Sequence, residues 1–258
     1  MRILFLGDIV AKSGREAVVN QLPSLKEKYH PDMTIVNGEN AAHGKGITAK
    51  IYNQLVLAGV DVITLGNHAF SKQDILNHLP STRQMIRPAN MEPSHIGQSY
   101  VIKVIKDKKV AVVNLVGKVF MDICKEDPVI TMQRLLQQIE ADIIIVDFHA
   151  EATAEKITFA QYFAQHLTAV LGTHTHVQTA DERIIDGCAY ISDVGMCGSF
   201  DSILGRDIEE VISRSIYNEP TRYTPAMGLA ILCGVIIDID EKTNRANRIE
   251  RIQIRPKG

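Results

Sequence analysis

Short apolar runs alternate with amphipathic stretches along most of the chain. The runs Ile3–Leu6, Met33–Val36, Asp61–Leu65 and Ile143–Phe148 are rich in Val, Ile and Leu, a composition typical of buried strands. Stretches with helical periodicity separate the early runs from one another. This alternation predicts an α/β protein that contains a parallel sheet.

The remaining pattern predicts further helices, a hairpin and C-terminal strands. The spacing of Ser13 and Glu16 matches a capping box, so the first helix is expected from there to Tyr29, with Pro23 bending or splitting it. Further helices are expected near 48–58, 72–79, 130–140, 153–165 and 207–217, a hairpin over 100–105 and 110–115, and strands near 169–172, 189–192, 228–239 and 248–254. The expected architecture is one domain over residues 1–258, with two mixed sheets between helices.

Composition excludes several classes of protein. Hydrophobic residues make up 45% and charged residues 22% of the 258 residues, which argues against intrinsic disorder. The net charge, 28 − 30 = −2, argues against a long nucleic acid or a membrane surface as partner. No apolar run approaches the ~20 residues of a membrane span. The 4 cysteines form no C-x-x-C pair, which favours free thiols and a cytoplasmic protein.

Residues able to bind a metal follow the predicted strands. They are Asp8, Glu39, Asn67, His68, His149, His174 and His176. Each alone is explained by an ordinary role, such as turn former, helix cap or structural histidine. Together they favour one shared site, because ligands of open α/β sheets bind outside the carboxyl ends of the strands. Carboxylate, amide and imidazole ligands suit Fe, Mn or Zn.

These motifs resemble those of the calcineurin-like metallophosphoesterases. The matching residues are Gly7–Asp8, Gly66–His68, an isolated strand-end His149, and Gly172–His176. The superfamily has a histidine in its first motif where this chain has Val10. Its second motif is also replaced, by the residues Asn-Gly-Glu-Asn at 37–40.

The residues that differ from the superfamily motifs resemble those of one branch, the YmdB-like bacterial phosphodiesterases. Stretches 37–46, 147–153, 172–181 and 193–196 carry this resemblance, which extends over nearly the whole chain. It implies a four-layer αββα sandwich and a dinuclear metal centre. It also implies cyclic-nucleotide phosphodiesterase activity, with 2′,3′-cyclic AMP favoured and 3′,5′-cyclic nucleotides left open, and a regulatory role in a bacterium.

The resemblance also assigns the metal ligands. Asp8, Glu39, Asn40 and His176 would hold the first metal, and Glu39, Asn67, His149 and His174 the second, with Glu39 bridging. The amide oxygen of Asn40 would replace the missing histidine. The resulting oxygen-rich site favours iron, with manganese or zinc as alternatives.

The expected mechanism is an in-line displacement at phosphorus. A water that bridges the two metals would lose a proton and attack, and His68 would protonate the leaving oxygen. Relatives often have an acidic residue after this histidine, whereas this chain has Ala69, so the partner that orients His68 is not predicted. Candidate substrate contacts are His43, Lys45 and Arg15, and Met196 and Phe200 could line a nucleobase pocket or pack in the core.

Other functions remain open from the sequence. A phosphomonoesterase or phosphoprotein phosphatase would use the same metal chemistry with a different pocket. A metal-dependent nucleotide sensor would need no leaving-group acid, so the presence of His68 favours turnover. The apolar C-terminal strands could form an internal sheet or the interface of a homo-oligomer.

Overall fold

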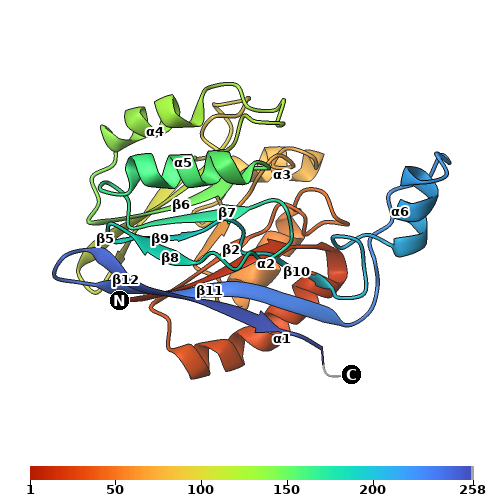
Figure 1. The fold of residues 1–258 in the computed structure, drawn as a ribbon, viewed down its shortest axis with the longest axis horizontal. Coiled ribbons are helices and arrows are strands. Elements are labelled where there is room, and N and C mark those ends of the chain that lie inside the picture. Colours follow the sequence, from red (N-terminus) through yellow and green to blue (C-terminus); the bar gives the residue numbers. More distant parts are fainter. Residues whose placement is uncertain (257–258) are drawn as a thin grey trace.

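Two six-stranded sheets face each other, and helices cover their outer faces (Figure 1). The computed structural model describes residues 1–256. The helices are α1 (Ala11–Tyr29), α2 (Ala49–Leu57), α3 (Gln73–His78), α4 (Pro128–Leu136), α5 (Thr153–Phe163) and α6 (Ile208–Ser215), with a 3-10 turn at Leu79–Ser81. The strands are β1 (Arg2–Ile9), β2 (Met33–Asn37), β3 (Val62–Thr64), β4 (Tyr100–Ile105), β5 (Lys108–Val116), β6 (Ile143–His149), β7 (Ala169–Thr173), β8 (Arg183–Ile185), β9 (Cys188–Ile191), β10 (Met196–Ser199), β11 (Ala230–Asp240) and β12 (Arg245–Ile254).

Both sheets combine parallel and antiparallel strands. The first has the order β12-β11-β10-β1-β2-β3, and the second has the order β4-β5-β6-β7-β9-β8. Strands β10, β1, β2 and β3 run parallel, as do β5, β6, β7 and β9, whereas β4, β8, β11 and β12 pair antiparallel with their neighbours. The predicted hairpin forms β4 and β5.

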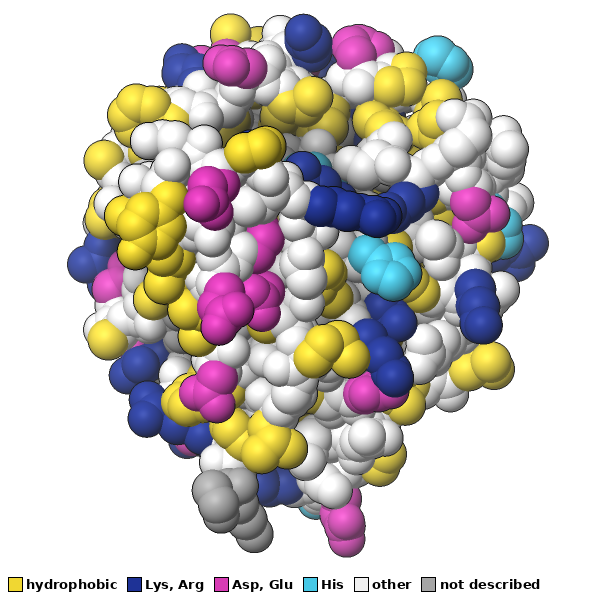
Figure 2. Space-filling view, turned by 90° about the vertical axis from the view of Figure 1, so that its right-hand side faces the viewer, with side chains coloured by type: hydrophobic (Ala, Val, Ile, Leu, Met, Phe, Trp, Pro, Cys, Tyr) yellow, Lys and Arg dark blue, Asp and Glu magenta, His cyan; other side chains and the backbone are white. Residues whose placement is uncertain are grey.

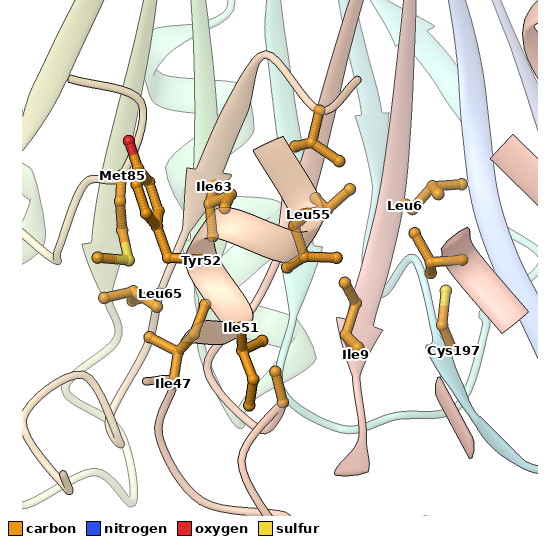
Figure 3. Packing of buried hydrophobic residues seen from close by; sticks show 14 of the residues in the cluster. Leu6, Ile9, Ile47, Ile51, Tyr52, Leu55, Ile63, Leu65, Met85 and Cys197 are labelled. Carbon is orange, nitrogen blue, oxygen red and sulfur yellow. The ribbon is translucent and has the colours of Figure 1, made fainter. Parts of the chain in front are cut away.

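The two-residue period of each strand divides its side chains between two cores. Ile3 and Phe5 pack in the core between the sheets, whereas Leu4 and Leu6 pack against α1 and α2. Figure 3 shows part of this outer core, where Leu55 of α2 approaches the sheet. In the second sheet, residues of β5 and β6 likewise alternate between the central core and the core beneath α4 and α5. The structure therefore confirms the predicted α/β class and the four-layer αββα sandwich.

The predicted start of the first helix is wrong. The helix begins at Ala11, with Val10 in the capping position and no side-chain cap. Strand β1 runs directly into the helix because the Val10 amide donates to the Cys197 carbonyl at 2.8 Å. Ser13 is therefore buried in the first turn. The helix also continues through Pro23 without splitting, so packing of its buried face outweighs the lost hydrogen bond.

Two short strands were not predicted from the sequence. β8 has 3 residues and β10 has 4, too few to show a period, and β10 contains a glycine.

No helix among residues 1–256 is long and apolar enough to cross a membrane. The 4 cysteines are free, as expected.

Candidate metal centre

The predicted metal-binding side chains converge where the carboxyl ends of the two sheets meet. Asp8 lies near the end of β1, and His149 is the last residue of β6. The other candidates lie in the loops that follow β2, β3 and β7. Glu39, His149 and His174 each offer a ligand atom within 4.8 Å of the other two.

The Nε2 atom of His149 lies at the centre of one group of ligand atoms. Glu39 Oε1 is 3.2 Å away, Asn67 Oδ1 is 2.9 Å away and His174 Nδ1 is 3.0 Å away. A ring nitrogen carries at most one hydrogen, so it cannot donate to all three of these atoms. Such close packing of ligand atoms is typical of a site that binds a cation.

A buried hydrogen-bond relay determines which nitrogen of His149 carries the proton. The hydroxyl of Thr173 donates to Asp147 Oδ1 at 2.7 Å, and His149 Nδ1 lies 2.8 Å from the same hydroxyl. Since Thr173 has a single hydroxyl hydrogen, Nδ1 must be the donor to its oxygen. In neutral His149, Nε2 then carries no hydrogen, and its lone pair faces the oxygens of Glu39 and Asn67.

A second group of ligand atoms surrounds Asp8. Its Oδ1 atom is fully buried and has no hydrogen-bond partner among residues 1–256. His176 Nε2 lies 3.9 Å from this oxygen and 3.3 Å from Asn40 Oδ1. The ring of His176 is oriented by the carbonyl of Leu204, 2.9 Å from Nδ1. A buried carboxylate oxygen without a partner fits a cation ligand, because leaving it unpaired is otherwise costly.

Burial and charge shift the pKa values of this cluster strongly. Burial raises the pKa of Asp8 to about 7. Burial opposes ionisation of Glu39, but the charge and hydrogen bond of His149 lower its pKa to about 2. Burial also opposes protonation of His149, yet the carboxylates of Glu39 and Asp8 raise its pKa to about 9. Burial and the charge of His149 lower the pKa of His174 to about 3. In the metal-free protein a proton on His149 therefore offsets the buried carboxylates.

The backbone of the His-x-His segment bends so that its two imidazoles separate. His174 has φ of 101° and His176 has φ of 66°, both in the left-handed region. His174 consequently joins the group around His149, and His176 joins the group around Asp8. The donor sets therefore fit two neighbouring cations, one for each group.

A buried ion pair, which the sequence analysis missed, holds this segment. Lys156 Nζ lies 3.0 Å from Asp193 Oδ2 and donates to the Thr173 carbonyl at 2.8 Å. Asp193 Oδ2 also accepts from the Thr175 amide at 2.9 Å. The pair thus fixes the backbone on both sides of His174. A helical lysine is ordinarily solvent-exposed, so its sequence position gave no signal.

His68 lies beside the cluster without entering either group of ligands. Its amide donates to Glu39 Oε2 at 2.9 Å. Its ring nitrogens lie 3.4 Å from Asn67 Nδ2 and 3.5 Å from Ser71 Oγ. Ser71, rather than an acidic residue in the place of Ala69, is therefore the side chain next to Nδ1. Burial lowers the pKa of His68.

A cavity of about 480 Å³ opens onto the cluster. We call it the cationic cavity, since Lys45, Arg206 and Arg214 line it together with Tyr223 and Glu151. Figure 2 shows the face from which α6 projects, where Lys and Arg side chains gather beside an exposed histidine. Among the basic and aromatic residues of this lining the sequence analysis named only Lys45, because Arg214 lies on α6 and Arg206 and Tyr223 lie in the loops that flank it, without a motif.

Other predicted contacts lie away from this cavity. Among residues 1–256, His43 and Arg15 are not part of its lining, and the Arg15 guanidinium donates to the Ala41 carbonyl instead. Met196 is buried beside Val10. A second cavity, of about 260 Å³, also adjoins the cluster, and we call it the Phe120 cavity; it is lined by Asn67, His68, Phe120, Met121, Asp122, Ile123 and His174.

Comparison with known proteins places the chain in a family. The model of the YmdB-like protein family matches residues 4–252. The chain belongs to the YmdB-like family. This confirms the predicted resemblance and a hydrolase of the metallophosphoesterase type.

Similar proteins match over nearly their full length. A Bacillus subtilis protein named 2′,3′-cyclic-nucleotide 2′-phosphodiesterase is 47% identical, over 98% of this YmdB-like chain and 97% of its own. A crystal structure of a hypothetical protein from Thermus thermophilus has a TM-score of 0.93, 36% identity and 100% coverage of both chains. The crystal structure of a Mycoplasma pneumoniae protein described as a novel phosphatase has a TM-score of 0.95 and 36% identity, covering 99% of this chain and 93% of that one.

Proposed function

We propose that the protein hydrolyses 2′,3′-cyclic nucleotides with two metal ions held by the cluster. The observation that carries the proposal is the convergence of Glu39 Oε1, at 3.2 Å, and Asn67 Oδ1, at 2.9 Å, on His149 Nε2. The named activity of the Bacillus subtilis relative supports the substrate class. We also infer that the chain acts as one domain, since both sheets contribute side chains to the cluster.

The ligands divide into two sets that share one carboxylate. Asp8, Glu39, Asn40 and His176 would hold one ion, and Glu39, Asn67, His149 and His174 the other. When bound, the ions polarise the phosphoryl oxygens and make a water molecule nucleophilic near neutral pH. Oxygen atoms outnumber nitrogens in the first set, which favours iron or manganese over zinc there.

His68 would act as the general acid. It lines both cavities, so a phosphate at the cluster would lie beside its ring. As the oxygen of a water molecule bonds to phosphorus, the P–O2′ bond would break and the proton of His68 would move to the 2′ oxygen, which leaves a nucleoside 3′-phosphate. Lys45 and Arg214 line the cationic cavity and would attract the anionic substrate.

Metal analysis and a substrate panel test the proposal. The purified protein should contain two metal ions per chain and hydrolyse 2′,3′-cyclic AMP faster than 3′,5′-cyclic AMP and phosphomonoesters. Glu39→Gln, prepared in the same way, controls for contaminating hydrolases. Preference for a phosphomonoester would favour the phosphatase alternative, and no turnover across the panel would favour the sensor.

A further inference from the structure

Phe120 is an exposed aromatic residue on a strained backbone. Its side chain is 86% exposed, and among the large apolar side chains of residues 1–256 only Leu57, at 88%, is more exposed. Its φ of 62° lies in the left-handed region, which bulky residues rarely adopt. Core packing explains neither feature, since the ring is not buried.

Hydrogen bonds hold the loop that carries this ring. The Glu155 carboxylate accepts from the amides of Lys118 at 2.9 Å and Val119 at 3.2 Å. The Met121 amide donates to the Lys118 carbonyl at 3.3 Å. Strained conformations persist where the surroundings over-determine them, and they concentrate at ligand sites. The backbone that carries Phe120 is therefore held in place.

The ring faces a space that reaches the metal ligands. The lining of the Phe120 cavity combines His68 and His174 with the apolar side chains of Phe120, Met121 and Ile123, next to Asp122. A phosphoester held at the ligands would thus place the rest of its molecule beside an aromatic and apolar wall. Such a wall suits the face of a flat heterocycle.

The other aromatic ring near the cluster is already engaged. Lys45 Nζ lies 5.4 Å and Arg206 Cζ 4.8 Å from the centroid of the Tyr223 ring. The Tyr223 hydroxyl also donates to the Gly44 carbonyl at 3.4 Å. A base stacking on Tyr223 would have to displace cations that the ring already attracts. The structure gives no such cation over Phe120 within residues 1–256.

We propose that the nucleobase of the substrate stacks on Phe120, which is then a binding residue for the base. The inference rests on the proposed function, because it requires a nucleotide whose phosphate reaches the metal ligands. Stacking is tolerant of base identity, so it predicts a general nucleotide requirement and no strong choice among bases.

The test compares Phe120→Ala, Phe120→Leu and Phe120→Trp on two substrates. One is 2′,3′-cyclic AMP, and the other is methyl riboside 2′,3′-cyclic phosphate, which lacks a base. The Ala and Leu variants should raise KM for the nucleotide about 5- to 150-fold, leave kcat nearly unchanged and leave the base-free substrate unaffected. The Trp variant should retain the wild-type KM. Phe200→Ala is the matched control, since Phe200 is an exposed aromatic that lines neither cavity.

Calorimetric titration of the metal-loaded protein with adenosine 3′-monophosphate gives a readout that does not depend on turnover. Phe120→Ala should weaken this binding by a similar factor. If the wild type hydrolyses no cyclic nucleotide, the proposed function fails, while this titration still decides the stacking inference. Unchanged binding in Phe120→Ala would overturn it. So would equal losses on both substrates, or a rise in KM in Tyr223→Leu that Phe120→Ala does not show.

Discussion

Removing the hydroxyl of Thr173 should weaken both the fold and the metal site. Thr173→Val keeps the shape of the side chain but breaks the relay between Asp147 and His149. Both partners are fully buried, so His149 Nδ1–H is left without an acceptor. Asp147 keeps its hydrogen bonds from Asn37 and Thr64.

The magnitude follows from these contacts. A buried group left unpaired costs about 1–3 kcal/mol, and Thr173→Val affects one donor and one acceptor. We expect the free energy of unfolding of the metal-free protein to fall by about 2–6 kcal/mol. Loss of a hydrogen-bond partner of a ligating histidine typically costs about 10- to 100-fold in metal affinity.

Denaturant unfolding and chelator competition measure the two effects. Thr173→Ser, which keeps the hydroxyl, should remain close to the wild type. Thr34→Val is the matched control, because Thr34 is fully buried in β2 and its Oγ1 has no hydrogen-bond partner within the described chain. If Thr173→Val loses no more stability than Thr34→Val and binds metal normally, the relay does not orient His149.

Three further predictions address charge, proton transfer and pH. Glu39→Gln should fold but lose metal and activity, because Gln keeps the shape of the shared ligand without its charge; full metal content by elemental analysis would contradict this. His68→Ala should keep both metals while turnover of 2′,3′-cyclic AMP falls by ~10²–10⁴, with a much smaller loss on a nitrophenyl phosphodiester whose leaving group needs no protonation; equal losses would refute the acid role. Metal must displace the proton of His149 below pH about 9 and that of Asp8 below pH about 7. Affinity of the set that contains His149 should therefore fall about tenfold per pH unit below 9, and affinity of the set that contains Asp8 about tenfold per unit below 7; affinities that do not change with pH would show that these protons are not displaced.

The positions of the expected ligands could be predicted because they follow parallel strands. Asp8, Glu39 and His149 each lie near, at or beyond the carboxyl end of a strand whose apolar run is visible in the sequence. Strand polarity alone brings such ends together, so no knowledge of side-chain packing was needed. The position of Asp147 could also have been predicted, since it lies two residues before His149 and the period of a strand puts both on one face.

The loops around the site carried no comparable signal. Phe120 and Tyr223 lie in segments without periodicity, so the sequence does not say which cavity they enter. The error at Ser13 has a different cause. Its spacing from Glu16 satisfies the local rule, but the contact between Val10 and β10 fixes the start of the helix, so tertiary structure overrides the local preference.

The buried pair of Lys156 and Asp193 indicates how the site is maintained. Both side chains are almost wholly buried, and an ion pair in such a place commonly adds little or no stability over apolar residues of the same volume. Its contacts instead fix the carbonyl of Thr173 and the amide of Thr175, which flank His174. A non-glycine residue with φ of 101° is strained and persists only if its neighbours hold it. The position of the His174 ring thus explains the pair: the fold accommodates two buried charges, and the ring of this expected ligand points toward His149.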